Sequence, residues 1–296
     1  MHPAPSIIAF TVLSGLGFGL LTFLGLGAIN PTGLIAFGFF TLAYALAVGG
    51  LLASTLHLGN PKNALLAFTQ WQTSWLSREA WLSVLALVVM GLYAIGAIFF
   101  GIQIRFFGIL GAALSVATVL ATSMIYTQLK TVPRWNQWPT PLLFLTFSLS
   151  GGAILANLPH FAFVLLLITG VVLMLHWLQG DTQFAARGST METATGLGFI
   201  GKVRLLESPH TGSNYLMKEM IYVVGRKHAL RLRWIALTLA IVVPELILLS
   251  LPSSHLAALL AISTHLVGAF AARWLFFAEA EHVVGLYYGK RQGFLT

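Results

Sequence analysis

The chain has 296 residues, of which 57% are hydrophobic and only 8% are charged, and its mean hydropathy is +0.87. Soluble domains carry about 25% charged residues, so this composition excludes a soluble globular domain and indicates a protein embedded in lipid. Sixteen Lys and Arg residues outnumber eight Asp and Glu residues, but they gather in a few connecting segments, which is typical of membrane topology rather than nucleic-acid binding. Cysteine is absent, which excludes a thiolate-bound iron–sulfur cluster, a covalent c-type haem and a disulfide in this chain.

Apolar stretches of membrane-spanning length follow one another along the chain. A transmembrane helix needs about 20 such residues, because the hydrocarbon core is about 30 Å thick and each residue rises about 1.5 Å. Eight stretches qualify: Ile7–Ile29, Leu34–Leu56, Ala80–Gln103, Phe106–Tyr126, Pro139–Ala156, His160–Gln179, Arg233–Leu251 and His255–Ala278. Only Asn157-Leu158-Pro159 separates the fifth from the sixth. The sequence predicts an all-α integral membrane bundle of eight transmembrane helices, forming a single transmembrane anchor domain over residues 1–296.

The positive charges indicate the orientation of this bundle. Eight spans place both termini and the segments after spans two, four and six on one side of the membrane. Every Lys and Arg except Arg105 and Arg273 falls in those segments, and positive residues are retained in the cytoplasm, so both termini are predicted to be cytoplasmic. All eight tryptophans also fall at or near this side. Such a one-sided belt fits a surface that faces a partner or a substrate, or simple interfacial anchoring.

One connection, at about residues 180–230, is too long for a plain turn and is predicted to be cytoplasmic. Ser213 and Asn214 can cap a short helix within it. Leu216, Met220, Ile221 and Val224 would share one face of that helix. This pattern predicts an amphipathic helix that lies on the membrane surface or against a docked protein.

Two titratable residues stand at the cytoplasmic ends of neighbouring spans. His57 ends the second span and Glu79 begins the third, so their side chains can converge on one pocket just below the membrane surface. A quinone gains or loses a proton at each oxygen as electrons pass, and both a histidine and a carboxylate can exchange those protons. The alternative is structural: His57 caps one helix, and Glu79 favours the positive N-terminus of the next.

Other polar residues in the spans allow further interpretations. His176 and Arg273 map to the cytoplasmic side and could complete a polar rim, or form salt bridges. Glu245 follows Pro244, which can kink its helix and leave a carbonyl free, and His265 lies near mid-depth in the last span. Glu245 and His265 would suit a secondary transporter, but such proteins usually show inverted repeats, and none is evident here. A b-type haem would need two histidines at matching depth, and His265 has no such companion.

Several motifs resemble the DmsC family, the membrane anchor subunits of DMSO-reductase type. They are His57-Leu58-Gly59-Asn60-Pro61, Ser77-Arg78-Glu79, His210 to Tyr215, and the stretch from Arg273-Trp274 to Glu281-His282. The resemblance extends over most of the chain. His2 to Ser6 and Asn214 to Met220 are more similar to anchors that accompany cytoplasmic sulfite-oxidising enzymes.

The resemblance implies a multi-pass subunit of the bacterial inner membrane that holds no haem, no iron–sulfur cluster and no metal of its own. It would exchange electrons between membrane quinone, menaquinone or ubiquinone, and a four-cluster ferredoxin-like subunit, which connects to a molybdenum bis-pterin catalytic subunit. Sulfite oxidation by quinone is favoured, and DMSO reduction by quinol comes next. The resemblance assigns the family's quinone-linked histidine and glutamate to His57 and Glu79. We add Arg78, His176 and Arg273 as expected quinone-site residues, with partner docking expected at Lys62, Lys218, Arg226 and Lys227.

Overall fold

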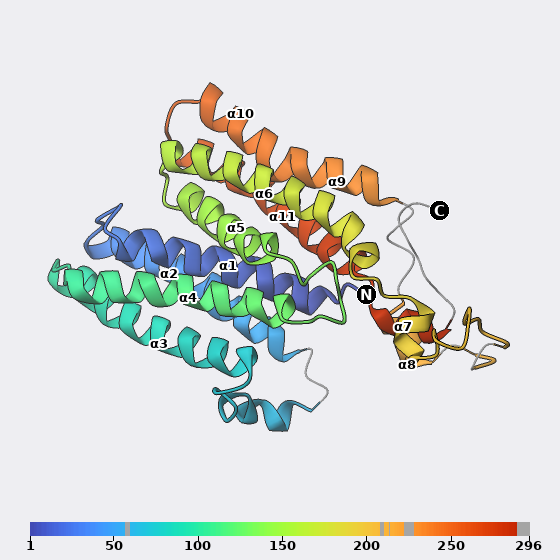
Figure 1. Ribbon diagram of the computed structural model, residues 1–296. Helices are drawn as coiled ribbons and strands as arrows, with labels where there is room; N and C mark the ends of the chain where they lie inside the picture. Colours follow the sequence, from blue (N-terminus) through green and yellow to red (C-terminus); the bar gives the residue numbers. More distant parts are fainter. Residues whose placement is uncertain (57–59, 208–209, 213, 222–227, 289–296) are drawn as a thin grey trace.

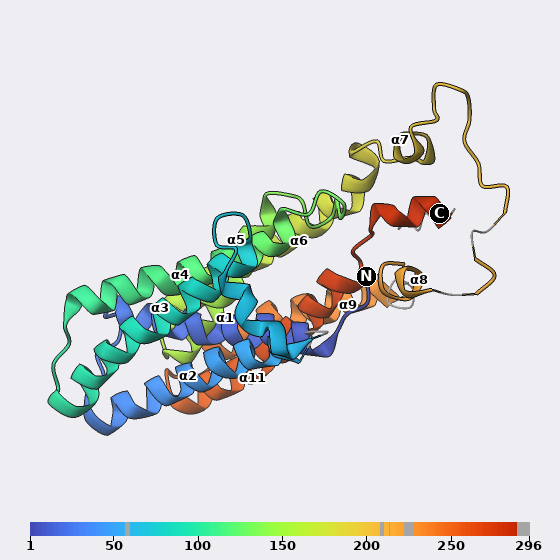
Figure 2. The same ribbon diagram turned by 90° about the horizontal axis from the view of Figure 1, so that it is seen from below.

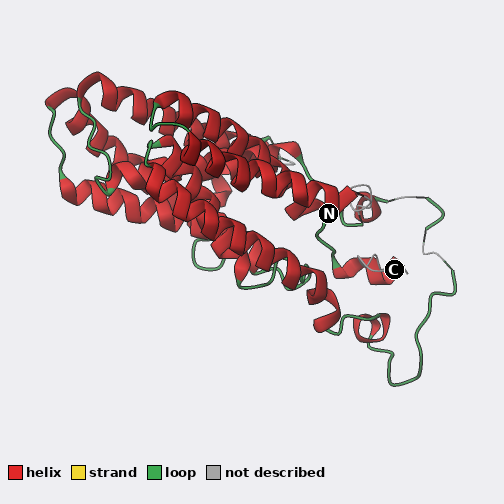
Figure 3. Cartoon of the chain, turned by 90° about the horizontal axis from the view of Figure 1, so that it is seen from above, coloured by secondary structure: helices red, strands yellow, loops and turns green. Residues whose placement is uncertain are grey.

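The computed structural model describes residues 1–56, 60–207, 210–212, 214–221 and 228–288, without the side chains of residues 61 and 62. Those residues form helices and loops, and no strand occurs among them (Figures 1 and 3). The elements are α1 (Pro5–Gly25), α2 (Gly33–Thr55), η1 (Pro61–Phe68), α3 (Trp75–Ile95), η2 (Gly96–Phe100), α4 (Arg105–Thr127), α5 (Pro139–Leu155), α6 (Pro159–Ala186), α7 (Met191–Thr195), α8 (Tyr215–Glu219), α9 (Ala229–Leu237), η4 (Thr238–Val242), α10 (Val243–Ser250), α11 (His255–Ala278) and η5 (Val283–Tyr288). The predicted all-α class is confirmed.

Seven helical segments in the described residues are long and apolar enough to cross a membrane. They are α1, α2, α3 with η2, α4, α6, the continuous segment from α9 to α10, and α11. Helix α5 is also apolar but has only 17 residues. At about 1.5 Å per residue it is about 26 Å long, slightly short of a hydrocarbon core. It lies within the bundle beside α1, α4 and α6 (Figure 1).

Helix α1 lies at the centre of the bundle, and small residues let its neighbours approach closely. Its apolar window is 78% buried, whereas no other span exceeds 50%. A Cβ on Gly19 would lie 1.9 Å from the carbonyl oxygen of Ser148 in α5, and one on Gly152 would lie 2.3 Å from the backbone of Gly19. Lipid supplies little hydrophobic drive between helices, so backbone contact of this kind is a main source of their packing energy. The predicted role of Gly19 and Gly152 in close packing agrees with these contacts.

The N-terminus and the short helices of the long connection gather at one end of the bundle (Figures 1 and 2). The Met1 amine donates a hydrogen bond to the carbonyl of Ala280 at 2.6 Å, and the backbone N–H of His2 donates to the carbonyl of Glu219, at the end of α8, at 2.8 Å. Helix α8 is capped by the Asn214 side chain, which accepts from the N–H of Met217 at 2.9 Å. The predicted cap and short helix are therefore present. Ser213 and Val224 lie outside the described residues.

Candidate functional site

Glu79 lies in the first turn of α3 with its side chain turned into the bundle. It is 4% exposed, and its Oε1 accepts a hydrogen bond from the hydroxyl of Thr122 in α4. No ion pair of Glu79 occurs among the described residues. A buried carboxyl without a cation costs free energy when it is ionised, so it is suited to holding a proton. The predicted partner of Glu79, His57, lies outside the described residues, and the convergence of the two side chains stays a prediction.

The two residues before Glu79 hold the preceding segment against α3. The Ser77 hydroxyl donates to the carbonyl of Ala67 and accepts from the N–H of Gln70. The Arg78 guanidinium donates to the carbonyls of Trp71 and Gln72 at 3.0 and 2.6 Å. Arg78 therefore lies on a different face of α3 from the carboxyl of Glu79. The helix begins at Trp75, five residues before the predicted start of the span, because this polar turn continues into it.

An aromatic groove opens on the Arg78 face, with a volume of about 520 Å³. Its lining residues are Phe68, Trp71, Trp75, Arg78, Trp81 and Leu82. The guanidinium of Arg78 lies 4.5 Å from the ring centre of Trp75, and the Trp81 indole donates to the carbonyl of Phe68 at 3.0 Å. Trp75 and Leu82 stand four residues before and three residues after Glu79, so the groove and the carboxyl occupy adjoining faces of one helix. A volume of this size is in the range of small-molecule sites.

Arg273 is brought close to Glu79 through Thr122. Its guanidinium is 6% exposed and lies 3.7 Å from the ring centre of Phe144. Thr122 and Arg273 both line a small cavity of about 20 Å³ in the bundle interior. Arg273 was expected in a polar rim, but the structure places it deeper, against aromatic rings, because α11 crosses the middle of the bundle there.

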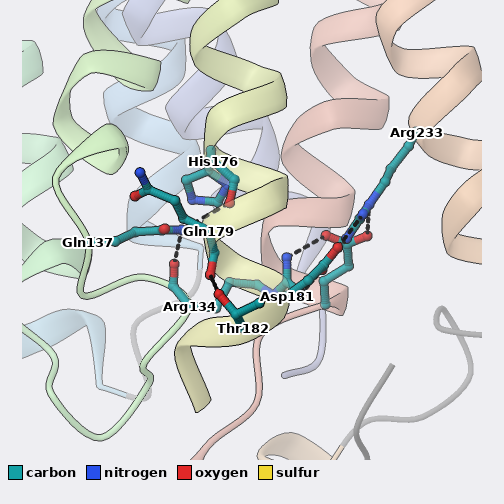
Figure 4. Close-up of polar contacts among 8 residues, drawn as sticks. Arg134, Gln137, His176, Gln179, Asp181, Thr182 and Arg233 are labelled. Carbon is teal, nitrogen blue, oxygen red and sulfur yellow. Dashed lines mark hydrogen bonds and ion pairs between the residues drawn. The ribbon is translucent and has the colours of Figure 1, made fainter. Parts of the chain in front are cut away.

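His176 lies elsewhere, behind a buried cluster of ion pairs. It is 2% exposed, its ring lies 5.6 Å from that of Phe276, and neither ring nitrogen has a hydrogen-bond partner among the described residues. Gln137 donates to the backbone carbonyl of His176 at 3.1 Å (Figure 4). The structure therefore does not place His176 beside Glu79.

The buried cluster consists of Arg134, Asp181, Arg233 and Glu279, and it joins four segments of the chain. Arg134 pairs with Asp181 and, at 3.2 Å, with Glu279. Arg233 pairs with the same two carboxylates, at 2.7 and 2.8 Å (Figure 4). Two guanidinium groups and two carboxylates balance one another, which is how buried charges are normally tolerated. Sequence reasoning weighed Glu279 as a salt-bridged residue but did not find its partners; the signal was the lone acid Asp181 at the end of an apolar span.

The expected docking residues are described in part. Lys218 is exposed in α8, whereas Arg226, Lys227 and the side chain of Lys62 lie outside the described part of the chain. Nearby, burial and the positive Met1 amine lower the pKa of His282, and its Nδ1 accepts from the N–H of Val284 at 3.0 Å. No group of three or more His, Cys, Asp or Glu residues that could hold a metal ion occurs among the described residues.

The helices and their apolar surface define a multi-pass helical membrane protein with a buried carboxyl near one end of the bundle. Residues 1–279 match the family model of the DMSO reductase anchor subunit (DmsC), and the chain belongs to that family. It is also 30% identical, over 97% of its length, to a subunit of the sulfite dehydrogenase of Allochromatium vinosum, 99% of which the alignment covers. No solved structure matches the chain. The predicted resemblance is confirmed.

Proposed function

We propose that the protein is the quinone-reactive membrane anchor of a molybdenum and iron–sulfur oxidoreductase of the bacterial inner membrane. It passes electrons between the quinone pool and a four-cluster ferredoxin-like subunit, which connects to a molybdenum bis-pterin catalytic subunit. The family and the sulfite dehydrogenase relative support this assignment. The identity of that relative favours sulfite oxidation by quinone, with DMSO reduction by quinol as the second candidate.

The observation that carries the proposal is the buried, unpaired carboxyl of Glu79 beside the aromatic groove of α3. A quinone site needs an apolar slot for the ring and the isoprenoid tail, together with a group that exchanges protons with the ring oxygens. The groove supplies stacking surface, and Glu79 supplies the proton. When bound, quinone supplies the two-electron chemistry. Glu79, together with His57 as the second proton-exchanging group, handles the protons at this end of the bundle.

The proposed topology has eight spans with both termini in the cytoplasm. Helix α5 is counted as the eighth span because it packs between α1, α4 and α6 over its length. The retention of positive residues in the cytoplasm then places the Glu79 end and the long connection on the cytoplasmic side. Electrons need only a short path from a partner cluster docked at that face.

The docking face is expected to be the cytoplasmic end that carries Lys218, with Lys62, Arg226 and Lys227 as further contacts. Basic side chains on one face steer an oppositely charged partner to it. Crosslinking of the purified complex with lysine-reactive reagents should join Lys218 to the iron–sulfur subunit. Crosslinks confined to the opposite end, around Arg105, would contradict the proposed face.

The proposed anchor carries no haem. Among the described histidines, His265 is held at the Ala240 carbonyl through Nδ1, and His176 lies beside the ion-pair cluster. An optical spectrum of the purified complex, freed of other cytochromes, should show no Soret band in proportion to this subunit. A stoichiometric Soret band would instead support the haem-containing alternative.

A further inference from the structure

A small polar cavity lies behind Glu79, in the interior of the bundle. It measures about 20 Å³, and its walls include Thr11, Ser14, Thr122, Ser148, His265 and Arg273. A buried water needs about 10–15 Å³ and two to four polar partners. The cavity meets both conditions, whereas a purely apolar cavity of the same size would stay dry.

Two buried polar atoms on α11 have no partner among the described residues, and their side chains line this cavity. They are Nη1 of Arg273 and Nε2 of His265, on side chains that are 6% and 0% exposed. An unsatisfied buried polar group costs about 1–3 kcal/mol, so native proteins normally supply such groups with a partner or a bound water. A single water could serve both atoms.

The geometry of His265 fixes which of its nitrogens faces the cavity as an acceptor. Pro244 has no N–H, so the carbonyl of Ala240, four residues earlier, lacks its usual helical donor. The chain forms the π-helical turn η4 at this point, and Nδ1 of His265 lies 2.7 Å from that carbonyl. A carbonyl only accepts, so Nδ1 carries a proton, and in the neutral ring Nε2 is left as an acceptor.

Thr122 connects the cavity to Glu79. Its hydroxyl has one proton but two acceptors within reach, Oε1 of Glu79 and, at 3.0 Å, the carbonyl of Thr118. When Glu79 is ionised, the hydroxyl donates to it; when Glu79 is protonated, the hydroxyl can accept from the carboxyl and donate to Thr118 instead. The oxygen of Thr122 also keeps a lone pair for a donor in the cavity.

We propose that the cavity holds a bound water that accepts from Arg273, donates to Nε2 of His265 and to Thr122, and so completes a proton relay into Glu79. The inference rests on the proposed function, because the relay serves quinone chemistry at Glu79. In quinol oxidation, two electrons pass to the partner's iron–sulfur cluster and one proton passes to Glu79. The relay then moves that charge inward: Glu79 gives its proton to Thr122, Thr122 gives its own to the water, and the water gives one to Nε2 of His265. The reverse sequence returns a proton to Glu79 for quinone reduction.

A matched set of substitutions in the complete complex tests the relay. Thr122→Val has nearly the same shape but no hydroxyl, and Thr122→Ser restores the hydroxyl. Thr118→Val is the control, because Thr118 is also buried in α4, donates only to the carbonyl of Leu114 at 2.8 Å, and does not line the cavity. His265→Asn retains a donor near the Ala240 carbonyl and removes the nitrogen that faces the cavity.

Acid–base groups contribute roughly 10²–10⁴-fold to a rate, and Thr122→Val leaves Glu79 itself in place, so quinone turnover should fall about tenfold with little change in KM. His265→Asn should behave alike, while Thr122→Ser and Thr118→Val stay near the unmodified rate. Infrared difference spectra on quinone reduction should contain a water band that shifts in H₂¹⁸O. That band should disappear in Thr122→Val and His265→Asn and persist in Thr118→Val.

The outcomes separate this inference from the proposed function. Unchanged turnover and an unchanged water band in both Thr122→Val and His265→Asn would overturn the relay, even if Glu79→Gln abolishes quinone turnover. Full quinone turnover in Glu79→Gln would instead remove the quinone site itself. If Thr122→Val fails to assemble, as judged by activity with an artificial dye, His265→Asn and Thr122→Ser decide the question by the same two measurements.

Discussion

A complex that carries Glu79→Gln is expected to lose quinone turnover by roughly a hundredfold or more, the range that a positioned acid–base group contributes, while it still assembles. Glutamine keeps the volume of the side chain and can still accept the hydrogen bond from Thr122. It has no titratable proton, so it cannot exchange protons with the quinone. Turnover with a quinone analogue, measured on purified complex, checks this result.

Dye-linked activity is the internal control for Glu79→Gln. An artificial dye exchanges electrons with the catalytic or iron–sulfur subunit directly, so it bypasses the quinone site and should report an unaffected enzyme. His57→Asn should give the same pattern if the two residues flank one quinone. Full quinone turnover in both variants, or a loss that follows failed assembly, would mean that both residues are structural.

Protons and electrons in this scheme use the same side of the membrane. Glu79 lies in the first turn of α3, at the end that carries the N-terminus and α8. The relay behind it ends at His265, inside the bundle, and does not open a path to the far side. We therefore expect the half-reaction of the anchor to generate no membrane potential, in contrast to a subunit that takes protons from one side and electrons from the other.

Most of the helical architecture could be predicted from the sequence, because each span is a long local run of apolar residues. The carbonyl left free by Pro244 could also be predicted, because proline lacks the donor that an α-helix needs. Helix ends were harder to place. Helix α3 begins at Trp75 and α9 at Ala229, both before the predicted starts, because polar turns at the membrane surface continue into these helices.

The site was predicted only where its residues are close in sequence or repeat a family motif. Glu79 stands in such a motif, but its hydrogen bond to Thr122 joins residues 43 positions apart. That contact depends on how α3 packs against α4, which local patterns do not encode. The tryptophan belt shows the same limit. Trp71 and Trp138 are exposed, as a belt requires, but Trp135 is 3% exposed and stacks on Phe276 at 5.3 Å.

The buried ion-pair cluster should be the most sensitive structural feature of the cytoplasmic end. Glu279 has a side chain only 1% exposed and pairs with both Arg134 and Arg233. Glu279→Gln leaves two guanidinium groups with one carboxylate, Asp181, in a poorly hydrated place. Removing one partner of a buried ion pair typically costs about 3–5 kcal/mol. We expect the variant to accumulate poorly in the membrane and to unfold at a clearly lower temperature in detergent.

Two further variants make this expectation specific to the charge. Glu207→Gln removes an exposed acid from the long connection and should leave the unfolding temperature unchanged. Arg134→Met combined with Glu279→Gln removes one charge of each sign and leaves the neutral pair of Arg233 with Asp181. If excess positive charge causes the loss, this double variant should be more stable than the sum of its single variants indicates, because groups in one network are not additive. A double variant whose losses simply add would show that Glu279 acts through packing, and the cluster would then not be held by charge balance.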